Sequence, residues 1–206
     1  MKTSRLIGIN RHRIGMDGSG ITTLVLFHGC PLHCKYCLNP QALSAKGMWK
    51  RLSPEALYTE ISRDDLYFRA TAGGVTFGGG EPLLSYRQIL HFHQLCIANG
   101  NRWKLNIETS LNVPTVMVKA LENIIDQWIV DIKDMNPTIY QAYTGRDNAL
   151  VIQNLQHLLD TKADITVRVP LIPMYNTEED VEKSTALLQK MGVSQIDKFK
   201  YIIKTH

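Results

Sequence analysis

The sequence predicts an α/β fold in which a parallel β-sheet is covered on its outside by helices. Six short segments rich in apolar and β-branched residues alternate with helix-like segments, and this alternation is typical of βα units. Because the strand-like segments are almost continuously apolar, we expect them to be buried on both faces, as parallel strands are. A chain of 206 residues suffices for one well-cored domain and is short for two.

The expected strands end at glycine, proline or polar residues. The first ends at Phe27 and is followed by a loop that contains cysteines. The second stops at three consecutive glycines, 78–80, and the fifth is followed by Pro170 and Pro173, which keep the next loop extended. In chain order, the six expected strands cover residues 22–27, 74–77, 103–108, 128–132, 165–169 and 199–203.

The expected helices are recognised by signals at their ends. Ser53-Pro54-Glu55 combines an N-cap, a proline at the first helical position and an early acidic residue. Asp147 is expected to cap a later helix, and Gly192 is expected to terminate the last one. In chain order, the helices are expected over residues 53–68, 85–99, 114–123, 147–160 and 177–192.

Composition and charge are ordinary for a globular protein. Hydrophobic residues make up 44%, charged residues 20%, and the net charge is +4. The densest basic spot, Arg11-His12-Arg13, is interpreted as a solvated turn and not as a nucleic-acid-binding patch. No apolar run approaches a membrane span or resembles a secretory signal, so we expect a cytoplasmic protein.

Three of the four cysteines lie close together, because Cys30, Cys34 and Cys37 have the spacing C-x3-C-x2-C. Cysteines clustered in this way favour metal or redox chemistry over structural disulfides in a cytoplasmic protein. Four thiolates fill every iron of a four-iron cluster, whereas three leave one iron open for a substrate or cofactor. The fourth cysteine, Cys96, lies in an apolar helical stretch and is expected to pack in the core.

A zinc site is the alternative interpretation of these cysteines. His28 or His33 could complete a set of four ligands. Zinc sites usually combine C-x2-C with a second, distant pair of ligands, and the sequence has no such pair. A chain stapled by metal in this way would be a binding module without turnover, and the polar residues at the strand ends disfavour that hypothesis.

Side chains capable of chemistry follow each of the expected strands. The carboxyl ends of parallel strands meet at one edge of the sheet, where α/β proteins form their sites. We therefore expect these side chains to converge on one opening. They are Cys30, Glu81, Glu108, Thr109, Ser110, Asp131, Lys133, Arg168 and His206.

The segment Gly78-Gly79-Gly80-Glu81-Pro82 follows the second expected strand. By itself it predicts a flexible turn between a strand and a helix. A phosphate-binding loop is disfavoured because neither Lys-Ser nor Lys-Thr follows the glycines. Glycines permit the backbone to approach a ligand closely, so the segment is a candidate for binding.

Together, these motifs resemble the radical S-adenosylmethionine (SAM) superfamily, which implies a single-domain partial (β/α)6 barrel. The cysteine spacing and the Gly-Gly-Glu-Pro segment are similar to the cluster and SAM motifs of that superfamily. From about residue 20 to residue 206, the chain further resembles the glycyl-radical-enzyme activating enzymes, of which pyruvate formate-lyase activase is the best-known type. This second likeness lies in residues 23–30, Tyr36, Asn39, 108–110, 131–136 and 168–173.

The resemblance implies roles for the matching residues. Cys30, Cys34 and Cys37 would ligate a [4Fe-4S] cluster whose open iron binds the amino and carboxylate groups of SAM. Residues 79–81 would hold the methionyl amine of SAM. Lys133 would reach the carboxylate or the ribose.

The remaining matches imply contacts around the rest of the cofactor. Asn39 and His206 would lie near the nucleoside end, and Arg168 would face the substrate backbone. Tyr36 and Ser110 belong to the same implied SAM-binding set. A site for a monovalent cation, Na+ or K+, is implied at Glu108, Thr109, Ile129 and Asp131.

Three departures from the pyruvate formate-lyase activase type imply a minimal member of the family. Glu108 stands where that type has aspartate. The sequence ends at His206, before the tail that closes that barrel, and no cysteine-rich insert follows the cysteine loop. We divide the chain into an N-terminal turn or hairpin extension, 1–20, and a radical SAM partial barrel, 21–206.

The implied activity is reductive cleavage of SAM to a 5′-deoxyadenosyl radical that installs a glycyl radical on a partner enzyme. A flavodoxin- or ferredoxin-type protein would donate the electron under anaerobic conditions, and neither nucleic acid nor a membrane is an expected partner. The alternative is radical SAM modification of a ribosomal peptide or a small molecule. The sequence has neither a peptide-recognition domain nor cysteines for auxiliary clusters, which favours the activase.

Overall fold

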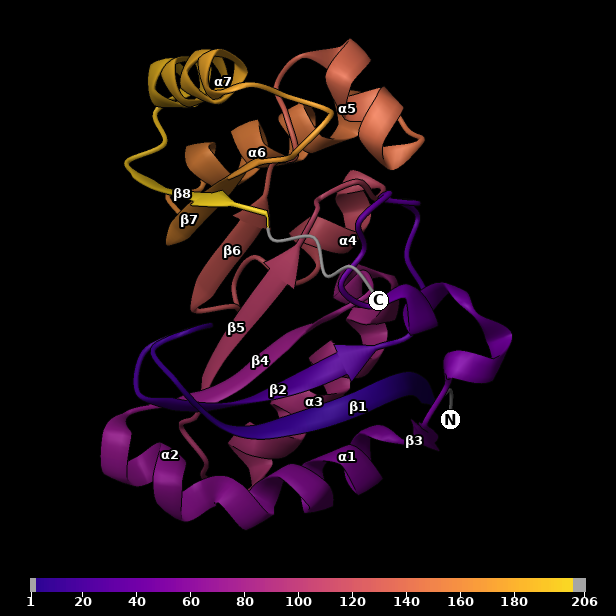
Figure 1. Cartoon of the computed structure of the whole chain (residues 1–206). Helices are drawn as coiled ribbons and strands as arrows, with labels where there is room; N and C mark the ends of the chain where they lie inside the picture. The colour runs from indigo at the N-terminus through magenta and orange to yellow at the C-terminus, as the bar shows by residue number, and fades with distance from the viewer. Residues whose placement is uncertain (1–2, 202–206) are drawn as a thin grey trace.

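Eight strands form a single sheet that curves around the interior of the protein, with the helices on its outside (Figure 1). The computed structural model describes residues 3–201. Six strands run parallel in the order β2, β4, β5, β6, β7, β8, and β1 and β3 extend the sheet beyond β2 by antiparallel pairing. The predicted α/β partial barrel is therefore confirmed. The strands are β1 Ser4–Ile14, β2 Ile21–Phe27, β3 Lys50–Leu52, β4 Gly74–Gly79, β5 Lys104–Thr109, β6 Gln127–Asp131, β7 Ile165–Leu171 and β8 Gln195–Lys200.

The first five expected strands correspond to β2, β4, β5, β6 and β7 to within two residues at each end. The bounds of the sixth are wrong, because it was expected over 199–203 and β8 begins at Gln195. β8 is an edge strand that pairs only with β7, and five of its six side chains are exposed. Its sequence therefore lacks the apolar pattern of a buried strand. Residues 202 and 203 lie outside the described residues.

The first twenty residues contribute a long strand to the sheet. A turn or small hairpin was expected over residues 5–20, whereas β1 pairs with β2 on one side and with β3 on the other. Residues 15–20 form the connection from β1 to β2, and three of the six are glycines with positive φ. The division of the chain at residue 20 remains a prediction.

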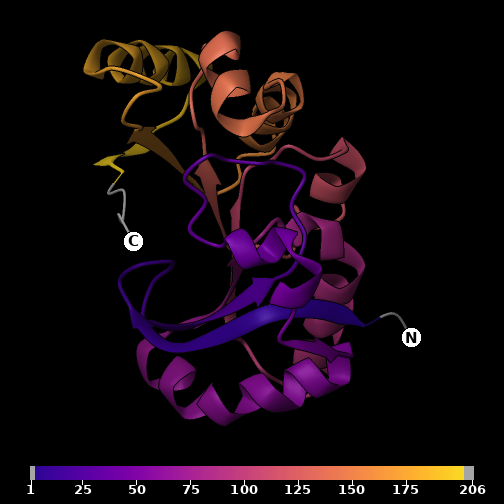
Figure 2. The ribbon, with the colours of Figure 1, turned by 45° about the vertical axis from the view of Figure 1, so that its right-hand side comes forward.

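The helices lie outside the strands, with α1 and α2 below them and α5–α7 above them in Figure 2. The expected helix over 53–68 is divided by a 3-10 turn, Ser62–Asp64, where the Asp64 carboxylate accepts a hydrogen bond from the Thr23 hydroxyl (2.7 Å). Among residues 3–201, no helix is both long enough and apolar enough to cross a membrane. The helices are α1 Pro54–Ile61, α2 Asp65–Thr71, α3 Tyr86–Ala98, α4 Thr115–Lys119, α5 Pro137–Thr144, α6 Ala149–Asp160 and α7 Glu178–Met191.

The helix signals had mixed outcomes. The cap expected at Asp147 is displaced by one residue, because the N-cap of α6 is Asn148 and the Asp147 carboxylate before it accepts a hydrogen bond from the Ala149 N–H (3.0 Å). Gly192 ends α7 with a φ of 105°. The helix expected over 114–123 is shorter, because α4 ends at Lys119. α5 was not predicted, although Asn136 caps it by accepting a hydrogen bond from the Thr138 N–H (2.9 Å).

The alternation of side chains along each strand decides which residues reach the interior. On β5, Leu105 and Ile107 belong to the hydrophobic core, whereas the intervening Asn106 and Glu108 line interior cavities. On β7, Val167 belongs to the core and Arg168 lines a cavity. The outer face of the sheet is therefore apolar beneath the helices, and its inner face carries polar groups.

β1 and β3 place two arginines directly opposite each other, Arg5 and Arg51. Both are exposed, and within the described chain neither forms an ion pair. Because like charges opposite each other destabilise an antiparallel pair, we expect Arg51→Glu to raise the free energy of unfolding by about 0.5–1 kcal/mol. Urea denaturation measures this change. The control is Arg51→Lys, which keeps the positive charge and is expected to leave the free energy of unfolding unchanged. A gain that persists undiminished in 1 M salt would contradict the electrostatic explanation.

Candidate active site

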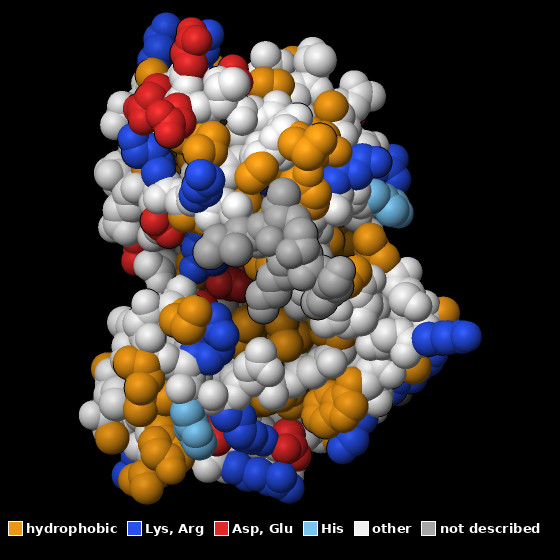
Figure 3. Space-filling model, in the orientation of Figure 1, with side chains coloured by type: hydrophobic (Ala, Val, Ile, Leu, Met, Phe, Trp, Pro, Cys, Tyr) orange, Lys and Arg blue, Asp and Glu red, His pale blue; other side chains and the backbone are white. Residues whose placement is uncertain are grey.

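The carboxyl ends of the parallel strands surround a cavity of about 510 Å3, a volume typical of small-molecule sites. In Figure 3, charged side chains of both signs lie in the hollow between the two halves of the molecule. From the cysteine loop and the end of β4, the cavity is lined by Cys30, Cys34, Cys37, Asn39, Gly79 and Gly80. From the ends of β5, β6 and β7, it is lined by Glu108, Thr109, Ser110, Asp131, Lys133 and Arg168.

The remaining site candidates lie elsewhere. Glu81 and Ile129 are buried and do not line this cavity. Tyr36 packs against Tyr143 and Tyr175, with ring centroids 6.1 and 5.8 Å apart, and also does not line it. His206 lies outside the described residues.

The cysteine loop is held by backbone hydrogen bonds to three other segments. Its first residue, His28, donates to the Arg5 carbonyl (2.9 Å), and Gly29 donates to Ala42 (2.8 Å). Farther along, the His33 N–H donates to the carbonyl of Thr144 at the end of α5 (2.8 Å). The loop is therefore fixed on both sides of the cysteines, and this prearranges the three thiols along one wall of the cavity.

Burial changes the acidity of the thiols. It raises the pKa of Cys30 to about 12, with a further contribution from the nearby Glu81 carboxylate. It also raises the pKa of Cys34, although the Lys133 ammonium acts in the opposite direction. These thiols are protonated near neutral pH in the metal-free chain, so metal binding must displace their protons.

The donor set fits an iron–sulfur cluster better than a single metal ion. Within the described chain, no three His, Cys, Asp or Glu side chains are placed to share one ion. The ligands of a cluster bind different irons and need not meet at one point. His28 and His33, the candidate zinc ligands, line a different depression, and Cys96 packs into the core from α3. Three thiols on one cavity wall thus agree with a cluster that has one open iron.

The backbone of the Gly-Gly-Glu segment lies against the cysteine loop. The Gly80 N–H donates to the Phe27 carbonyl (2.8 Å), and the Glu81 N–H donates to the Gly29 carbonyl (2.7 Å). Gly79 has a φ of 97°, and a Cβ on Gly80 would lie 2.2 Å from the Gly29 carbonyl oxygen. Only glycine permits this close approach, which brings the end of β4 beside the cysteines.

The Glu81 carboxylate is enclosed beneath this backbone and does not face the cavity. It accepts hydrogen bonds from the Thr109 hydroxyl (2.7 Å), from the Ser110 hydroxyl and N–H (2.7 and 3.0 Å), and from the Leu83 N–H (3.2 Å). Burial raises the pKa of this carboxyl, and the hydrogen bonds act in the opposite direction. Glu81 therefore joins the ends of β4 and β5, which positions neighbouring cavity residues.

Two ion pairs lie on the far wall of the cavity. Lys133 Nζ is 3.1 Å from the Asp131 carboxylate, and Arg168 Nη1 is 2.9 Å from the Glu108 carboxylate. Burial acts to lower the pKa of Lys133, but attraction to Asp131 leaves it above its usual range. Burial raises the pKa of Glu108, and Arg168 opposes that shift. Both carboxylates of the implied cation site thus already have a basic partner.

Sequence reasoning missed the cavity residues that come from the two ends of the sheet. Arg13 and Met16 enter from β1 and the turn after it, and the Met16 carbonyl accepts a hydrogen bond from Arg168 (2.8 Å). Phe199 and Tyr201 enter from β8 and the residue after it. Nothing in the local sequence indicates these positions, because only the curvature of the sheet brings its ends to the same cavity.

The Arg168–Glu108 pair gives a direct test of this geometry. Arg168→Met leaves a largely buried carboxylate without its partner and is expected to destabilise the protein by about 1.5–3 kcal/mol. Adding Glu108→Gln should recover part of that loss, since it removes the unpaired charge. The coupling is measured by urea denaturation in a double-mutant cycle, and additive effects of the two substitutions would contradict the pairing.

Comparison with known proteins places this geometry in a family context. Residues 24–188 match the family model of the radical SAM superfamily. The chain is 35% identical to the (2S)-3-sulfopropanediol dehydratase activating enzyme of Klebsiella oxytoca, over 85% of this chain and 74% of that protein. It is 28% identical to the pyruvate formate-lyase 2-activating enzyme of Escherichia coli (strain K12), over 94% of this chain and 75% of that protein.

A solved structure shows the same fold at low sequence identity. The crystal structure of Streptococcus suis SuiB bound to S-adenosylmethionine superposes with a TM-score of 0.65 at 14% identity. The match covers 85% of this chain and 39% of that chain, so this chain spans about two fifths of SuiB. The shared part is the partial barrel.

Proposed function

Because the chain belongs to the radical SAM superfamily, and within it to the glycyl-radical-enzyme activating enzymes, we propose that it installs a glycyl radical on a partner enzyme using a [4Fe-4S] cluster and SAM. The observation that carries this proposal is the single cavity that the three loop cysteines share with the polar residues at the strand ends. The chemistry that the two cofactors supply when bound is one-electron cleavage of SAM to methionine and a 5′-deoxyadenosyl radical, which abstracts a hydrogen atom.

The cysteine loop would hold the cluster, with Cys30, Cys34 and Cys37 each ligating one iron and the fourth iron left for SAM. The exposed peptide groups of Gly79 and Gly80 would accept hydrogen bonds from the methionyl ammonium. The Gly79 carbonyl already accepts one from the Asn39 amide (3.0 Å), which fixes its direction. The Glu81 side chain would position Gly79 and Gly80 by joining the ends of β4 and β5.

The ion pairs on the far wall would bind and orient the other charged groups. Lys133 would donate to the SAM carboxylate or ribose, while the Asp131 carboxylate holds the Lys133 side chain in place. Arg168, fixed by Glu108, would donate to the backbone of the substrate. Leu24, Leu26 and other apolar residues on the β2 side would exclude water from the reacting atoms. Glu108, Thr109, Ile129 and Asp131 would hold a monovalent cation as a further part of the proposal.

The proposed partners follow from the same chemistry. The substrate is a glycine Cα in a glycyl-radical enzyme, and the electron donor is a flavodoxin- or ferredoxin-type protein. We place the enzyme in an anaerobic cytoplasm, where thiols stay reduced and the cluster is protected from oxygen.

The test is anaerobic loading of the chain with iron and sulfide, followed by SAM. Addition of SAM is expected to change the electron paramagnetic resonance signal of the reduced cluster, and dithionite is expected to give 5′-deoxyadenosine. With the correct partner, a glycyl-radical signal should appear on that partner. A cluster spectrum that SAM leaves unchanged would refute the proposal. Turnover on a peptide or small molecule, with no radical on any glycyl-radical enzyme, would support the alternative.

A further inference from the structure

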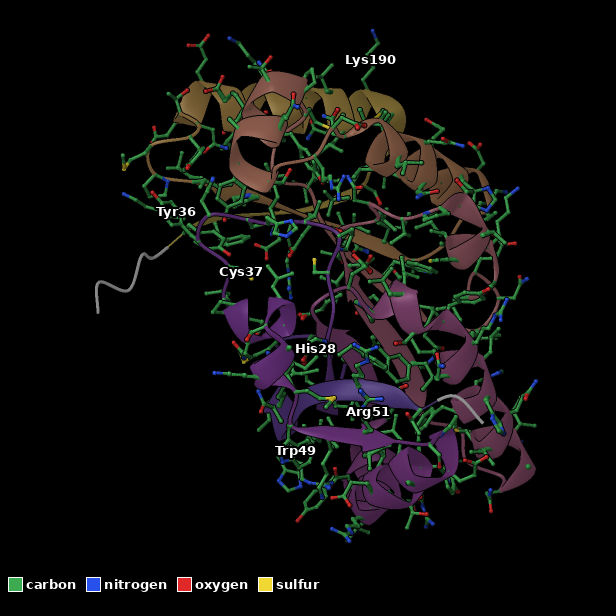
Figure 4. The ribbon with its side chains drawn as sticks, turned by 90° about the vertical axis from the view of Figure 1, so that its right-hand side faces the viewer. His28, Tyr36, Cys37, Trp49, Arg51 and Lys190 are labelled. Carbon is green, nitrogen blue, oxygen red and sulfur yellow. The ribbon has the colours of Figure 1, made fainter. Side chains whose placement is uncertain are left out.

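A second depression, of about 780 Å3, lies on the outer side of the cysteine loop. We call it the basic depression and define it by Arg5, Arg51, His28, His33 and Cys30. Within the described chain, no Asp or Glu lines it. Figure 4 shows His28 and Arg51 on the same face of the molecule as Cys37.

Cys30 is the residue that this depression shares with the interior cavity. It lines both, and the remaining described residues of the two linings differ. Cys30 thus lies between the depression on the surface of the protein and the interior cavity. A group bound in the basic depression would lie on one side of this thiol, and a substrate in the cavity would lie on the other.

The positions of the two arginines in the depression are expected to destabilise the fold. Arg5 and Arg51 are direct cross-strand partners, which is unfavourable for like charges. Other arginines near the sheet are neutralised, such as Arg11 by Glu60 and Arg13 by Asp17. An exposed pair of guanidinium groups with no acidic partner among residues 3–201 favours an external anionic ligand.

An exposed tryptophan lies close to Arg51 in the sequence, outside the lining of the depression. Trp49 precedes Arg51 by two residues, is 48% exposed and lies on the face shown in Figure 4. The ammonium of Lys50 lies 4.8 Å from the centre of the Trp49 ring. Exposed tryptophan and arginine side chains are enriched at the centres of protein–protein contacts. A macromolecular partner therefore fits this surface better than a small anion.

We propose that the basic depression is the docking surface of a small acidic redox protein that delivers one electron past Cys30. This inference rests on the proposed function. The reduced flavin or iron–sulfur centre of the donor loses one electron and the cluster of this chain gains it, while no bond forms between the two proteins. Because the donor docks outside the cavity, electron delivery and occupation of the cavity by substrate do not compete.

The test measures binding and electron delivery separately. Binding of fluorescently labelled oxidised flavodoxin to the cluster-loaded chain is followed by anisotropy at 50 and 300 mM KCl. Arg51→Glu and Arg5→Glu/Arg51→Glu are expected to weaken binding about tenfold or more at low salt, and most of the salt dependence should disappear. Arg102→Glu/Lys190→Glu is the matched control, since both residues are exposed, neither lines the depression, and Lys190 lies far from it on α7 (Figure 4).

Electron delivery is measured as 5′-deoxyadenosine formed with either of two reductants. With reduced flavodoxin, the depression variants are expected to be about tenfold slower than the control. With dithionite, which needs no docking surface, they should match the control. Because Arg51→Glu is expected to stabilise the fold, loss of flavodoxin binding in that variant cannot be attributed to unfolding.

Each other outcome has a distinct meaning. Flavodoxin affinity unchanged in both depression variants would overturn the docking proposal. Normal SAM cleavage with both reductants, combined with weaker transfer of the radical to the glycyl-radical enzyme, would assign the depression to that enzyme and also overturn the proposal. Absence of 5′-deoxyadenosine from the wild-type chain with either reductant would refute the proposed function, while the binding measurement would still decide the docking surface.

Discussion

Replacing Cys34 with alanine is expected to abolish formation of 5′-deoxyadenosine. Cys34 is one of only three thiols on the described cavity wall, so no spare ligand can take its place at the cluster. The expected result is an iron content well below that of the wild-type chain and no detectable SAM cleavage with dithionite. Iron analysis and chromatography of the anaerobically loaded variant measure both effects.

The matched control for this substitution is Cys96→Ala. Cys96 is 4% exposed and packs in the hydrophobic core from α3. Its loss is expected to lower the free energy of unfolding by about 1 kcal/mol and to leave iron content and SAM cleavage unchanged. Equal loss of iron from both variants would show that the effect at Cys34 is structural and would contradict its assignment as a cluster ligand.

Glu81→Gln is expected to destabilise the protein by about 2–4 kcal/mol, although the side chain keeps its size. The described hydrogen-bond partners of the Glu81 carboxylate are all donors, from Thr109, Ser110 and Leu83. A carboxylate can accept all of them, whereas the NH2 group of glutamine would face donors and leave them unsatisfied in a buried site. The midpoint of urea denaturation measures the loss.

Ser110→Ala separates this effect from the loss of a single hydrogen bond. The Ser110 hydroxyl is one of two hydroxyl groups that donate to Glu81, and its removal is expected to cost about 1 kcal/mol. If Glu81→Gln costs no more than Ser110→Ala, the carboxylate does not join β4 to β5 as the structure shows. The affinity of both variants for SAM then measures how strongly the hydrogen bonds between Glu81 and the end of β5 position Gly79 and Gly80.

Much of the fold could be predicted from local sequence patterns. β2, β4, β5, β6 and β7 are rich in apolar and β-branched residues because they pack against the helices in the hydrophobic core, and Thr177 and Gly192 mark the ends of α7. The predictions failed where burial is one-sided or where a tertiary contact intervenes. β8 is an exposed edge strand, and the hydrogen bond from Thr23 to Asp64 accompanies the division of the expected helix between α1 and α2.

The candidate site was predictable to a similar extent. Residues at the carboxyl ends of parallel strands share an edge for topological reasons, so the convergence of Cys30, Glu108, Asp131 and Arg168 on one opening followed from their positions in the sequence. The hydrogen-bond and ion-pair partners of these residues could not be predicted from their positions in the sequence. Glu81 was expected to help hold SAM, and this role remains a prediction, whereas the hydrogen bonds that its carboxylate accepts from Thr109 and Ser110 at the end of β5 could not be read from the sequence.

The sequence by itself indicated the type of chemistry, because the spacing of three cysteines in one loop predicts a cluster with one open iron without reference to the rest of the chain. Only the tertiary structure decided which partner or neighbour each charged side chain has. It paired Arg168 with Glu108, enclosed Glu81, and set Arg5 opposite Arg51 beside Cys30. These contacts join residues that are distant along the chain, and they exist because the sheet curves and brings its strands together.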